Sequence, residues 1–228
     1  MQLDKSREIW NPAPFEDKFQ ILIIGLGATG SWLLSNLARL GLAKSITCFD
    51  PDTVEMKNAN NQNYDNSDIG KSKVEASYEK CILLNEDFTK DNFVQDYFSP
   101  VKHRGYLSQP TVVYLCVDKG RKEIIECLIS NPNVRCLIET RIGVDAGKVY
   151  VVQDKKWWDS YYINTIPSRE QEETQAEVSS CGETLSIIPG VITTAAIAAQ
   201  AIRWFDTSSE VKYIEFEFGK GLHTYNIV

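Results

Sequence analysis

Apolar and polar residues alternate along this chain with two periods, one typical of strands and one typical of helices. Four short apolar runs have the composition of buried parallel strands, and they lie at residues 21–24, 45–49, 111–116 and 135–139. Three segments carry an apolar residue at every third or fourth position, which predicts helices at 29–40, 71–84 and 119–129. Strands that alternate with helices of this length form parallel sheets with right-handed crossovers. The pattern therefore predicts an α/β fold with a doubly wound, Rossmann-like, mainly parallel sheet.

The last third of the chain has a different pattern. Residues 148–153 alternate like the first strand of an antiparallel extension, and 211–218 and 222–227 alternate like a further pair around a glycine turn. A helix is predicted over 189–205, since a proline suits its first turn. Its small apolar face, which suits close packing, is formed by Ala195, Ala196, Ala198 and Ala199. The polar stretch before this helix predicts an irregular crossing loop at about 154–188. We therefore predict an antiparallel C-terminal extension of the sheet.

The length and the net charge limit the class of protein. The 228 residues fit one domain, which we place at 19–228 after an N-terminal arm at 1–18. The net charge of −7 argues against a broad surface for nucleic acid or for anionic membranes. No N-terminal signal pattern is visible, and the apolar helix near the C-terminus carries several polar side chains, including Arg203. We therefore expect a cytoplasmic protein with neither a nucleic-acid nor a membrane partner.

The cysteines are scattered and form no C-x-x-C pair. They are Cys48, Cys81, Cys116, Cys127, Cys136 and Cys181. Three lie in strand-like runs and two on apolar helix faces, which predicts reduced thiols in the core of a cytoplasmic protein.

The first strand, turn and helix carry a glycine motif. Gly25, Gly27 and Gly30 form G-x-G-x-x-G between the apolar run 21–24 and the helix that follows. The first glycine permits a tight turn, the second lets a pyrophosphate approach the backbone, and the third lets helix and strand pack closely. Asp50 ends the next apolar run, about 20 residues after Gly30, where an acid can hold a ribose hydroxyl. This context favours a nucleotide site, with a merely structural Rossmann turn as the alternative.

A long polar segment follows Asp50. Most strand–helix connections run about 2–6 residues, whereas residues 51–69 separate this strand from the next helix. The segment carries Asp52, Gln62 and five asparagines, and Asp68-Ile69-Gly70 then leads to Lys73. The asparagines are Asn58, Asn60, Asn61, Asn63 and Asn66. A loop this long in a compact domain is usually functional or disordered. The alternative is a solvated surface loop.

This ordered string of motifs resembles the ThiF/MoeB family, which is related to the activating enzymes of ubiquitin and its relatives. The resemblance covers residues 19–228 and rests on the glycine loop, the Asp-x-Asp, the Asn…Gln and the Asp-Ile-Gly-x-x-Lys. It implies an ATP-binding sheet and adenylation of the C-terminal carboxylate of a small ubiquitin-like or sulfur-carrier protein that ends in glycine. Transfer to a thiol follows in some relatives. Many relatives hold a structural zinc with two C-x-x-C pairs, and their absence here predicts no zinc.

The resemblance also implies roles for single residues. Adenylation brings a carboxylate onto the α-phosphate of ATP, so the site must supply positive charge, and Mg²⁺ is the expected ion. Asp118 follows the strand at 111–116 and matches the family's metal-holding aspartate; an N-cap of the next helix is a second, compatible role. Lys73 matches the family's phosphate-binding lysine, while Lys71 is expected to be solvated. Asn58 and Gln62 would donate to phosphate or ribose oxygens, and Asp50 would hold the ribose.

One position departs from the family pattern. Active adenylating members carry an arginine just before the glutamine, where this chain has Asn61, and an asparagine replaces neither the charge nor the fork of a guanidinium. We hypothesise that Arg141 takes over part of this charge; the alternative is an ion pair with Glu139 or with a loop carboxylate. Arg7, in the arm, is a second candidate, which would reach the site of a partner subunit as in dimeric relatives.

Cys181 is the cysteine that core packing explains least. It lies in Ser179-Ser180-Cys181-Gly182, after the polar part of the crossing loop. In some relatives a cysteine in this loop takes the activated acyl group. No histidine is near it in sequence, and a structural thiol is the alternative.

These observations leave three hypotheses. The first is an ATP- and Mg²⁺-dependent adenylyltransferase that forms a symmetric homodimer. The second is a degenerate, non-catalytic member that keeps the fold and serves as a scaffold or pseudo-subunit. The third is an NAD-dependent oxidoreductase, which leaves Asp52, Lys73 and Asp118 without a role.

Overall fold

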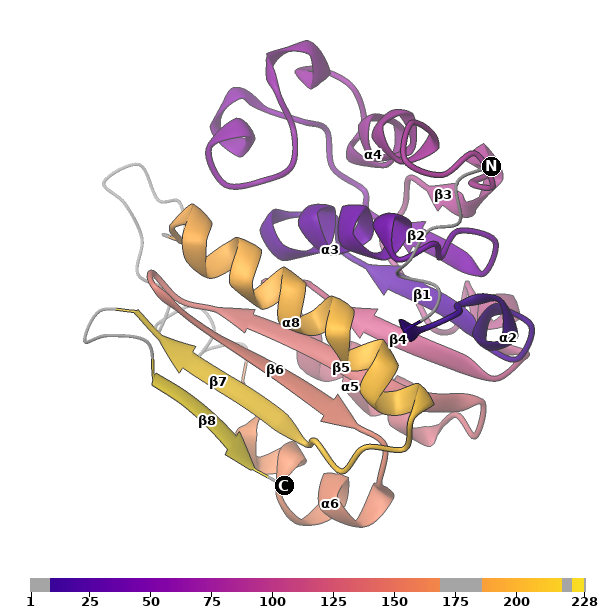
Figure 1. Ribbon diagram of the computed structural model, residues 1–228, viewed down its shortest axis with the longest axis vertical. Helices are drawn as coiled ribbons and strands as arrows, with labels where there is room; N and C mark the ends of the chain where they lie inside the picture. The colour runs from indigo at the N-terminus through magenta and orange to yellow at the C-terminus, as the bar shows by residue number, and fades with distance from the viewer. Residues whose placement is uncertain (1–8, 169–185, 219–222, 228) are drawn as a thin grey trace.

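The chain forms an eight-stranded sheet with the strand order β3-β2-β1-β4-β5-β6-β7-β8 (Figure 1). The computed structural model describes residues 9–168, 186–218 and 223–227, with side chains as far as residue 218. The strands are β1 (Gln20–Ile24), β2 (Ile46–Phe49), β3 (Phe93–Val94), β4 (Thr111–Leu115), β5 (Val134–Ile142), β6 (Ala146–Val152), β7 (Tyr213–Glu217) and β8 (His223–Ile227). The first five strands in this order are parallel, and β6, β7 and β8 add to β5 in antiparallel fashion. The predicted fold class, with its antiparallel extension, is confirmed.

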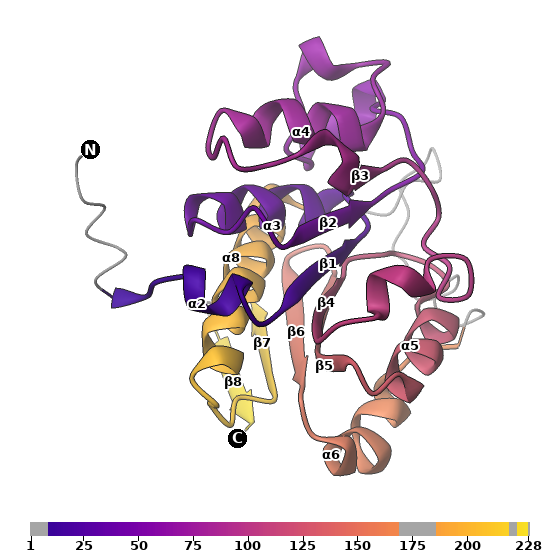
Figure 2. The same ribbon diagram turned by 90° about the vertical axis from the view of Figure 1, so that its right-hand side faces the viewer.

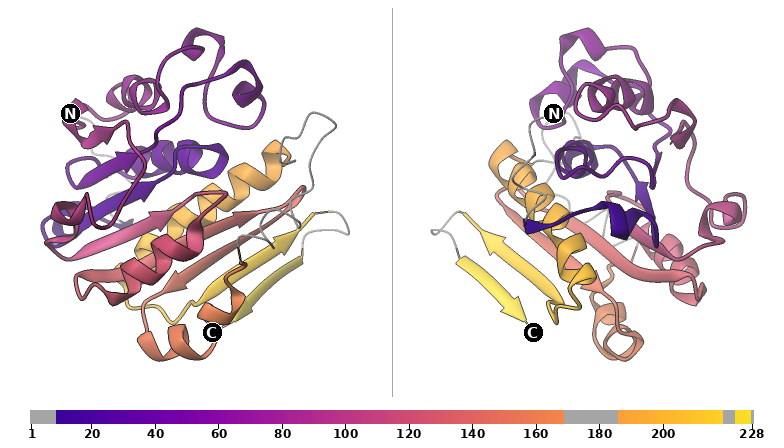
Figure 3. Two further views of the ribbon diagram at one scale, coloured as in Figure 1. Left: turned by 180° about the vertical axis from the view of Figure 1, so that it is seen from behind. Right: turned by 45° about the vertical axis from the view of Figure 1, so that its right-hand side comes forward.

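Helices cover both faces of the sheet. They are α2 (Ala13–Glu16), α3 (Ala28–Arg39), α4 (Lys73–Ile82), α5 (Arg121–Ser130), α6 (Lys155–Ser160) and α8 (Ile188–Asp206). Short 3₁₀ turns are η1 (Met56–Asn60), η2 (Asn66–Asp68), η3 (Lys90–Asn92), η4 (Arg104–Leu107) and η5 (Tyr162–Thr165). α3 and α8 lie on one face (Figure 1), and α5 and α6 on the other (Figures 2 and 3). Because strand side chains alternate, Ile21 and Ile23 of β1 join the core under α3 and α8, while Leu22 and Ile24 join the core under α5.

The sheet winds in both directions from β1. This strand pairs with β2 on one side and with β4 on the other, so that Ile23 lies between Cys48 and Tyr114. The carboxyl ends of β1 and β4 therefore lie side by side where the winding reverses, and ligands of open α/β sheets bind at such a switch point.

The long helix α8 is a helix of the core. By length and composition it is apolar enough to cross a membrane. In the structure it packs against α3, β5 and β6, with Ala195, Ala198 and Ala199 buried as predicted. Ala196 is exposed, because it lies on the outward side of the same helix. The apolar character of α8 is thus explained by its packing on the sheet.

The prediction of an irregular loop at about 154–188 is wrong for residues 155–165, which form α6 and η5. Asp154 accepts a hydrogen bond from the backbone N–H of Lys156 and begins α6, and η5 follows. Trp158 and Tyr162 are buried, and their rings lie 5.5 Å apart. These two aromatic residues, one helical turn apart, anchor the segment on the sheet, a feature that its polar neighbours concealed.

Part of the segment that we predicted as an arm packs on the domain. Phe15 of α2 is buried between Phe19 and Phe205. The carboxylate of Glu16 accepts hydrogen bonds from the backbone N–H groups of Ala43 and Ser45. The packed domain therefore extends at least to residue 13.

Four of the five cysteines that the structure describes are shielded. Cys48, Cys81 and Cys136 are buried and Cys116 is partly buried, whereas Cys127 is exposed on the outer side of α5, contrary to our expectation of a core thiol. Burial raises the pKa of Cys81 and the pKa of Cys116 to about 12 each.

Alkylation of the native protein is therefore expected to distinguish these thiols. Iodoacetamide at pH 8 should modify Cys127 within minutes and leave Cys48, Cys81, Cys116 and Cys136 unmodified, because a buried, protonated thiol is a poor nucleophile. Peptide mass spectrometry measures this, with the protein unfolded in urea as the control. Fast modification of Cys116 in the native protein would contradict the packing described here.

Candidate functional site

The glycine loop is held tightly against the end of β4. Gly25 has φ +93°, and a Cβ there would lie 2.7 Å from the carbonyl oxygen of Cys116. A Cβ on Gly30 would lie 1.9 Å from the carbonyl oxygen of Gly25. Both distances are shorter than any side chain tolerates, so these two positions require glycine. Their predicted roles in the turn and in helix–strand packing agree with this geometry.

Gly27 differs from the other two glycines because it faces open space. A Cβ on Gly27 would meet no atom within 4 Å, and this residue is the N-cap of α3 without any side-chain cap. The backbone N–H groups of the first helical turn have no acceptor within a helix and carry positive partial charge. An open, uncapped helix N-terminus after a strand fits an anion such as a phosphate group.

Asp50 connects the glycine loop to the segment after β2. Its Oδ2 accepts a hydrogen bond from the N–H of Leu26 (2.6 Å), and its Oδ1 accepts one from the N–H of Asp52 (2.9 Å). Burial raises the pKa of Asp50, and the charge of Lys73 and these two hydrogen bonds oppose the rise. Asp50 therefore fixes the loop in place, and its contact with a ribose stays a prediction.

Lys73 lies in the first turn of α4 and points back toward the end of β2. Its Nζ donates to Oδ2 of Asp52 (2.9 Å), and the lysine is 6% exposed while the side chain of Asp52 is 56% exposed. Lys71, in contrast, pairs with Glu79 (2.6 Å) and Asp68 (3.7 Å) away from this pair. A buried ammonium whose pairing carboxylate faces solvent is suited to an anionic ligand.

The polar segment 51–69 is folded rather than simply solvated. Oδ1 of Asn58 accepts from the N–H of Glu55, which closes a capping box on η1. Asn63 donates to the hydroxyl of Ser35 on α3, and the hydroxyl of Tyr64 donates to the carbonyl of Leu26 in the glycine loop. The segment is therefore packed against α3 and the loop.

Gln62 carries a buried acceptor without a donor. Within the described residues, its Oε1 has no hydrogen-bond partner. A buried acceptor without a partner lowers the free energy of unfolding by about 1–3 kcal/mol. A ligand hydroxyl or an ordered water would satisfy it, so this residue remains a candidate for nucleotide binding.

Asn61 joins distant parts of the site. Its side-chain Nδ2 donates to the hydroxyl of Ser186 (2.8 Å), just before α8, and its backbone carbonyl accepts from the indole N–H of Trp32 (3.2 Å). The residue that replaces the family's arginine thus holds the start of α8 against the polar segment, a contact that sequence reasoning missed.

Asp118 lies in the turn after β4, at the switch point. Its side chain is exposed. Helix α5 begins at Arg121 and is capped by Gly120 with φ +67°. The predicted N-cap role is therefore wrong, because the chain needs two further residues to turn into the helix. Within the described part of the chain, no three His, Cys, Asp or Glu side chains gather as metal ligands. Mg²⁺ needs only one or two carboxylates besides phosphate and water, and Asp118 fits that requirement.

A buried carboxylate lies beneath this turn. Glu139 is 0% exposed, and its two oxygens accept four hydrogen bonds. Oε1 accepts from Arg121 (2.9 Å) and from Nε of Arg141 (2.8 Å), and Oε2 accepts from Arg141 (2.7 Å) and from the hydroxyl of Tyr162 (2.7 Å). Burial opposes ionisation of Glu139, but these partners outweigh it and lower its pKa. We call Glu139, Arg121, Arg141 and Tyr162 the Glu139 cluster.

Arg141 is committed to this cluster. Besides Glu139 it donates to the carbonyl of Thr165 (2.6 Å), and its guanidinium lies over the ring of Tyr150 (4.5 Å). The ion pair with Glu139, which we gave as the alternative, is the contact that forms. The hypothesis that Arg141 supplies charge to the phosphates finds no support, because a buried Glu139 would be costly without this partner. Cys181 and Arg7 lie outside the described residues.

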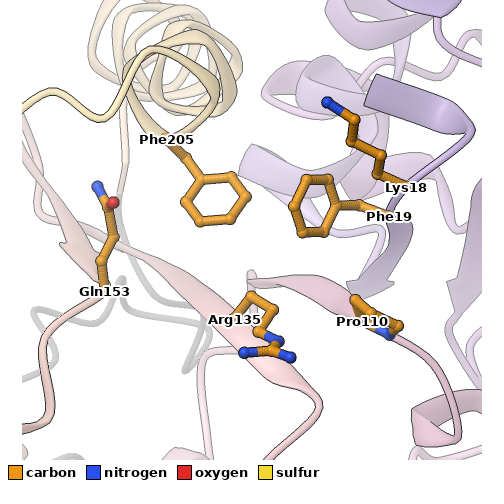
Figure 4. Close-up of a pocket in the computed structure, with 6 residues that line it drawn as sticks. All are labelled: Lys18, Phe19, Pro110, Arg135, Gln153 and Phe205. Atoms are coloured by element: carbon orange, nitrogen blue, oxygen red, sulfur yellow. The ribbon is translucent and has the colours of Figure 1, made fainter. Parts of the chain in front are cut away.

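A hollow lies at the other end of the parallel strands. Figure 4 shows the six residues that line it, Lys18, Phe19, Pro110, Arg135, Gln153 and Phe205. Lys18 and Phe19 precede β1, and Pro110 precedes β4. These positions are at the amino-terminal ends of the parallel strands, away from the glycine loop and Asp118.

Comparison with known proteins agrees with this geometry. The sequence matches the ThiF family over residues 17–227. It is 37% identical over 90 residues to tRNA threonylcarbamoyladenosine dehydratase of Haemophilus influenzae, a match that covers 39% of this chain and 34% of that protein. It is 31% identical over 139 residues to ubiquitin-like modifier-activating enzyme 5 of Caenorhabditis elegans, covering 56% of this chain and 31% of that protein. The matches thus span about a third of the length of these curated relatives.

Solved structures show the same fold. Escherichia coli MccB with ATP superposes with a TM-score of 0.67 at 16% identity, covering 95% of this chain and 67% of that chain. Another structure of MccB is a complex with N-formylated MccA. At this identity the likeness concerns the fold alone.

Proposed function

Since the chain belongs to the ThiF family, we propose that it binds ATP at the carboxyl ends of β1, β2 and β4 and adenylates a carboxylate. The observation that carries this proposal is the meeting of three features at the switch point. They are the open, uncapped N-terminus of α3 at Gly27, the buried ammonium of Lys73 and the exposed carboxylate of Asp118. Together they supply what a nucleotide triphosphate and its metal ion require.

The proposed reaction joins two anions. An oxygen of the substrate carboxylate attacks the α-phosphorus of ATP, and the bond to the bridging oxygen breaks, so that pyrophosphate leaves with the electron pair. The N–H groups at the start of α3 would hold phosphate oxygens, and Lys73 would turn its ammonium from Asp52 to the phosphates. Asp118 would hold Mg²⁺, which neutralises phosphate charge when bound.

We propose the C-terminal carboxylate of a small protein or peptide as the substrate. Similarity to a ubiquitin-like modifier-activating enzyme, and to the fold of MccB in its complex with MccA, supports this class. A ubiquitin-like or sulfur-carrier protein ending in glycine is the form we favour, with a cytoplasmic homodimer as the working assembly.

One observation favours a second candidate, a nucleotide-binding scaffold without adenylating activity. Asn61 is bonded to Ser186 and Arg141 to Glu139, so that neither side chain supplies the charge of the family's arginine. Loss of such a charge costs about 3–4 kcal/mol of transition-state stabilisation, the size of the effect of a lost oxyanion donor.

Calorimetric titration tests nucleotide binding. Wild-type protein is expected to bind Mg-ATP and not NAD, and Lys73→Ala should weaken ATP binding about 10- to 100-fold, the effect of a charged hydrogen bond of about 1.5–3 kcal/mol. Lys71→Ala is the matched control, because Lys71 pairs with Glu79 and Asp68 instead, and it should bind ATP like the wild type.

The outcomes separate the candidates. Binding of NAD in place of ATP would overturn the proposal. ATP binding without exchange of labelled pyrophosphate into ATP, in the presence of peptides that end in Gly-Gly, would favour the scaffold. Exchange that requires the peptide would establish adenylation.

A further inference from the structure

The Glu139 cluster connects the proposed site with a second segment that is distant from it in sequence. The site contributes the turn that presents Asp118, and the second segment consists of α6 and η5. Glu139 lies between them in β5, completely buried. Its four hydrogen bonds divide evenly, with two donors on each oxygen.

The first connection runs through Arg121. While one nitrogen of its guanidinium donates to Glu139 (2.9 Å), the other donates to the carbonyls of Val117 (3.1 Å) and Asp118 (3.2 Å). The backbone of the Asp118 turn is thereby tied to a completely buried carboxylate. The fork of a guanidinium makes this bridge, and a single ammonium cannot reproduce it.

The second connection runs through Arg141 and Tyr162. Tyr162 donates its hydroxyl to Glu139, and Arg141 donates to the carbonyl and the hydroxyl of Thr165. The hydroxyl of Thr165 in turn donates to the carbonyl of Tyr162 (2.7 Å). The last turn before residue 166 is therefore held to the same carboxylate as the Asp118 turn.

We propose that Glu139 is a positioning residue for this site, which sets the positions of Asp118 and of the α6–η5 segment together. The proposal rests on the proposed function, because the position of Asp118 matters for binding only if the site holds Mg²⁺ and ATP. Glu139 touches neither metal nor nucleotide, and it acts through Arg121 on one side and through Arg141 and Tyr162 on the other.

Hydrogen exchange without nucleotide tests the connection itself. Glu139→Gln should speed amide exchange about tenfold or more in peptides covering 116–121 and also in peptides covering 155–168. Arg121→Lys should affect only the first peptide, and Tyr162→Phe only the second. Glu215→Gln is the matched control and should affect neither peptide, because Glu215 in β7 is a partly exposed partner of Lys148. If Glu139→Gln left either peptide unchanged, the proposal would be overturned.

A titration with Mg²⁺ tests the consequence for the site. At fixed ATP, the Mg²⁺ concentration for half-maximal binding should rise about tenfold in Glu139→Gln and in Arg121→Lys, and stay unchanged in Tyr162→Phe. Affinity for ATP in EDTA should be the same in all of them, a pattern that general loss of structure would not produce. An equal loss of ATP affinity with and without Mg²⁺ would overturn the positioning role.

Failure of this inference is distinguishable from failure of the proposed function. If the wild type bound no ATP, the proposed function would fail while hydrogen exchange still decided whether Glu139 couples the two segments. Should Glu139→Gln not fold, Arg121→Lys and Tyr162→Phe still decide the matter, because each must affect its own segment alone.

Discussion

Gly30→Ala is expected to abolish the native glycine loop, with a loss of at least about 3 kcal/mol in the free energy of unfolding. The added Cβ would lie 1.9 Å from the carbonyl oxygen of Gly25, which is backbone and cannot move aside as a side chain would. Overpacking in well-packed interiors usually costs about 1–3 kcal/mol, and a contact this short between fixed elements exceeds that range. Urea unfolding measures the loss.

Gly27→Ala is the matched control in the same motif. A Cβ there meets no atom within 4 Å, so the free energy of unfolding should change by less than about 1 kcal/mol. ATP affinity should nevertheless fall about tenfold or more, because the methyl group occupies the space through which a phosphate would approach the backbone. Unchanged ATP binding in Gly27→Ala would contradict the phosphate site, and a fully stable Gly30→Ala would contradict the packing of the loop.

Glu139→Ala is expected to have the second large effect, a loss of about 3–5 kcal/mol in the free energy of unfolding. The reason is that it leaves the guanidinium groups of Arg121 and Arg141 in the interior without their carboxylate. Glu215→Ala removes the partner of Lys148 at 2.8 Å on the surface and should cost about 0–1 kcal/mol. Denaturant unfolding of both variants at pH 7 gives the comparison.

The same measurement has a defined pH dependence. The pKa of Glu139 is lower in the folded protein than in the unfolded chain, where it is about 4.3. The contribution of the Glu139 carboxylate to the free energy of unfolding is therefore fully present at a pH above its unfolded pKa. It is lost as the pH falls through the lower pKa of the folded protein. The difference between wild type and Glu139→Ala should be constant from pH 6 to 8 and shrink as the pH falls below about 4. A difference that grew on acidification would contradict the ion-pair cluster.

Local patterns in the sequence predicted much of the fold and part of the site. The period of apolar residues predicted the strands at 21–24 and 111–116, and a strand that ends in a G-x-G-x-x-G predicted the turn that Gly25 and Gly30 form. Asp118 was expected to follow a buried strand at the switch point, and it does so, while its role as a metal ligand stays a prediction. These inferences succeed because they depend on residues a few positions apart, whose spacing directly determines backbone geometry.

The partners of individual side chains were decided by the tertiary structure. Arg141 had three candidate partners in sequence, the phosphates, Glu139 and a loop carboxylate, and the burial of Glu139 on the same strand selected the ion pair. Asn61 meets Ser186, which is 125 positions away, and Tyr162 meets Glu139 across 23 positions. The sequence by itself thus determined most of the sheet strands and the long helices, their order and the glycine loop, because periodicity and turn chemistry are local. The tertiary structure alone decided which charged groups are buried together, because desolvation and pairing depend on neighbours that only the folded sheet brings into contact.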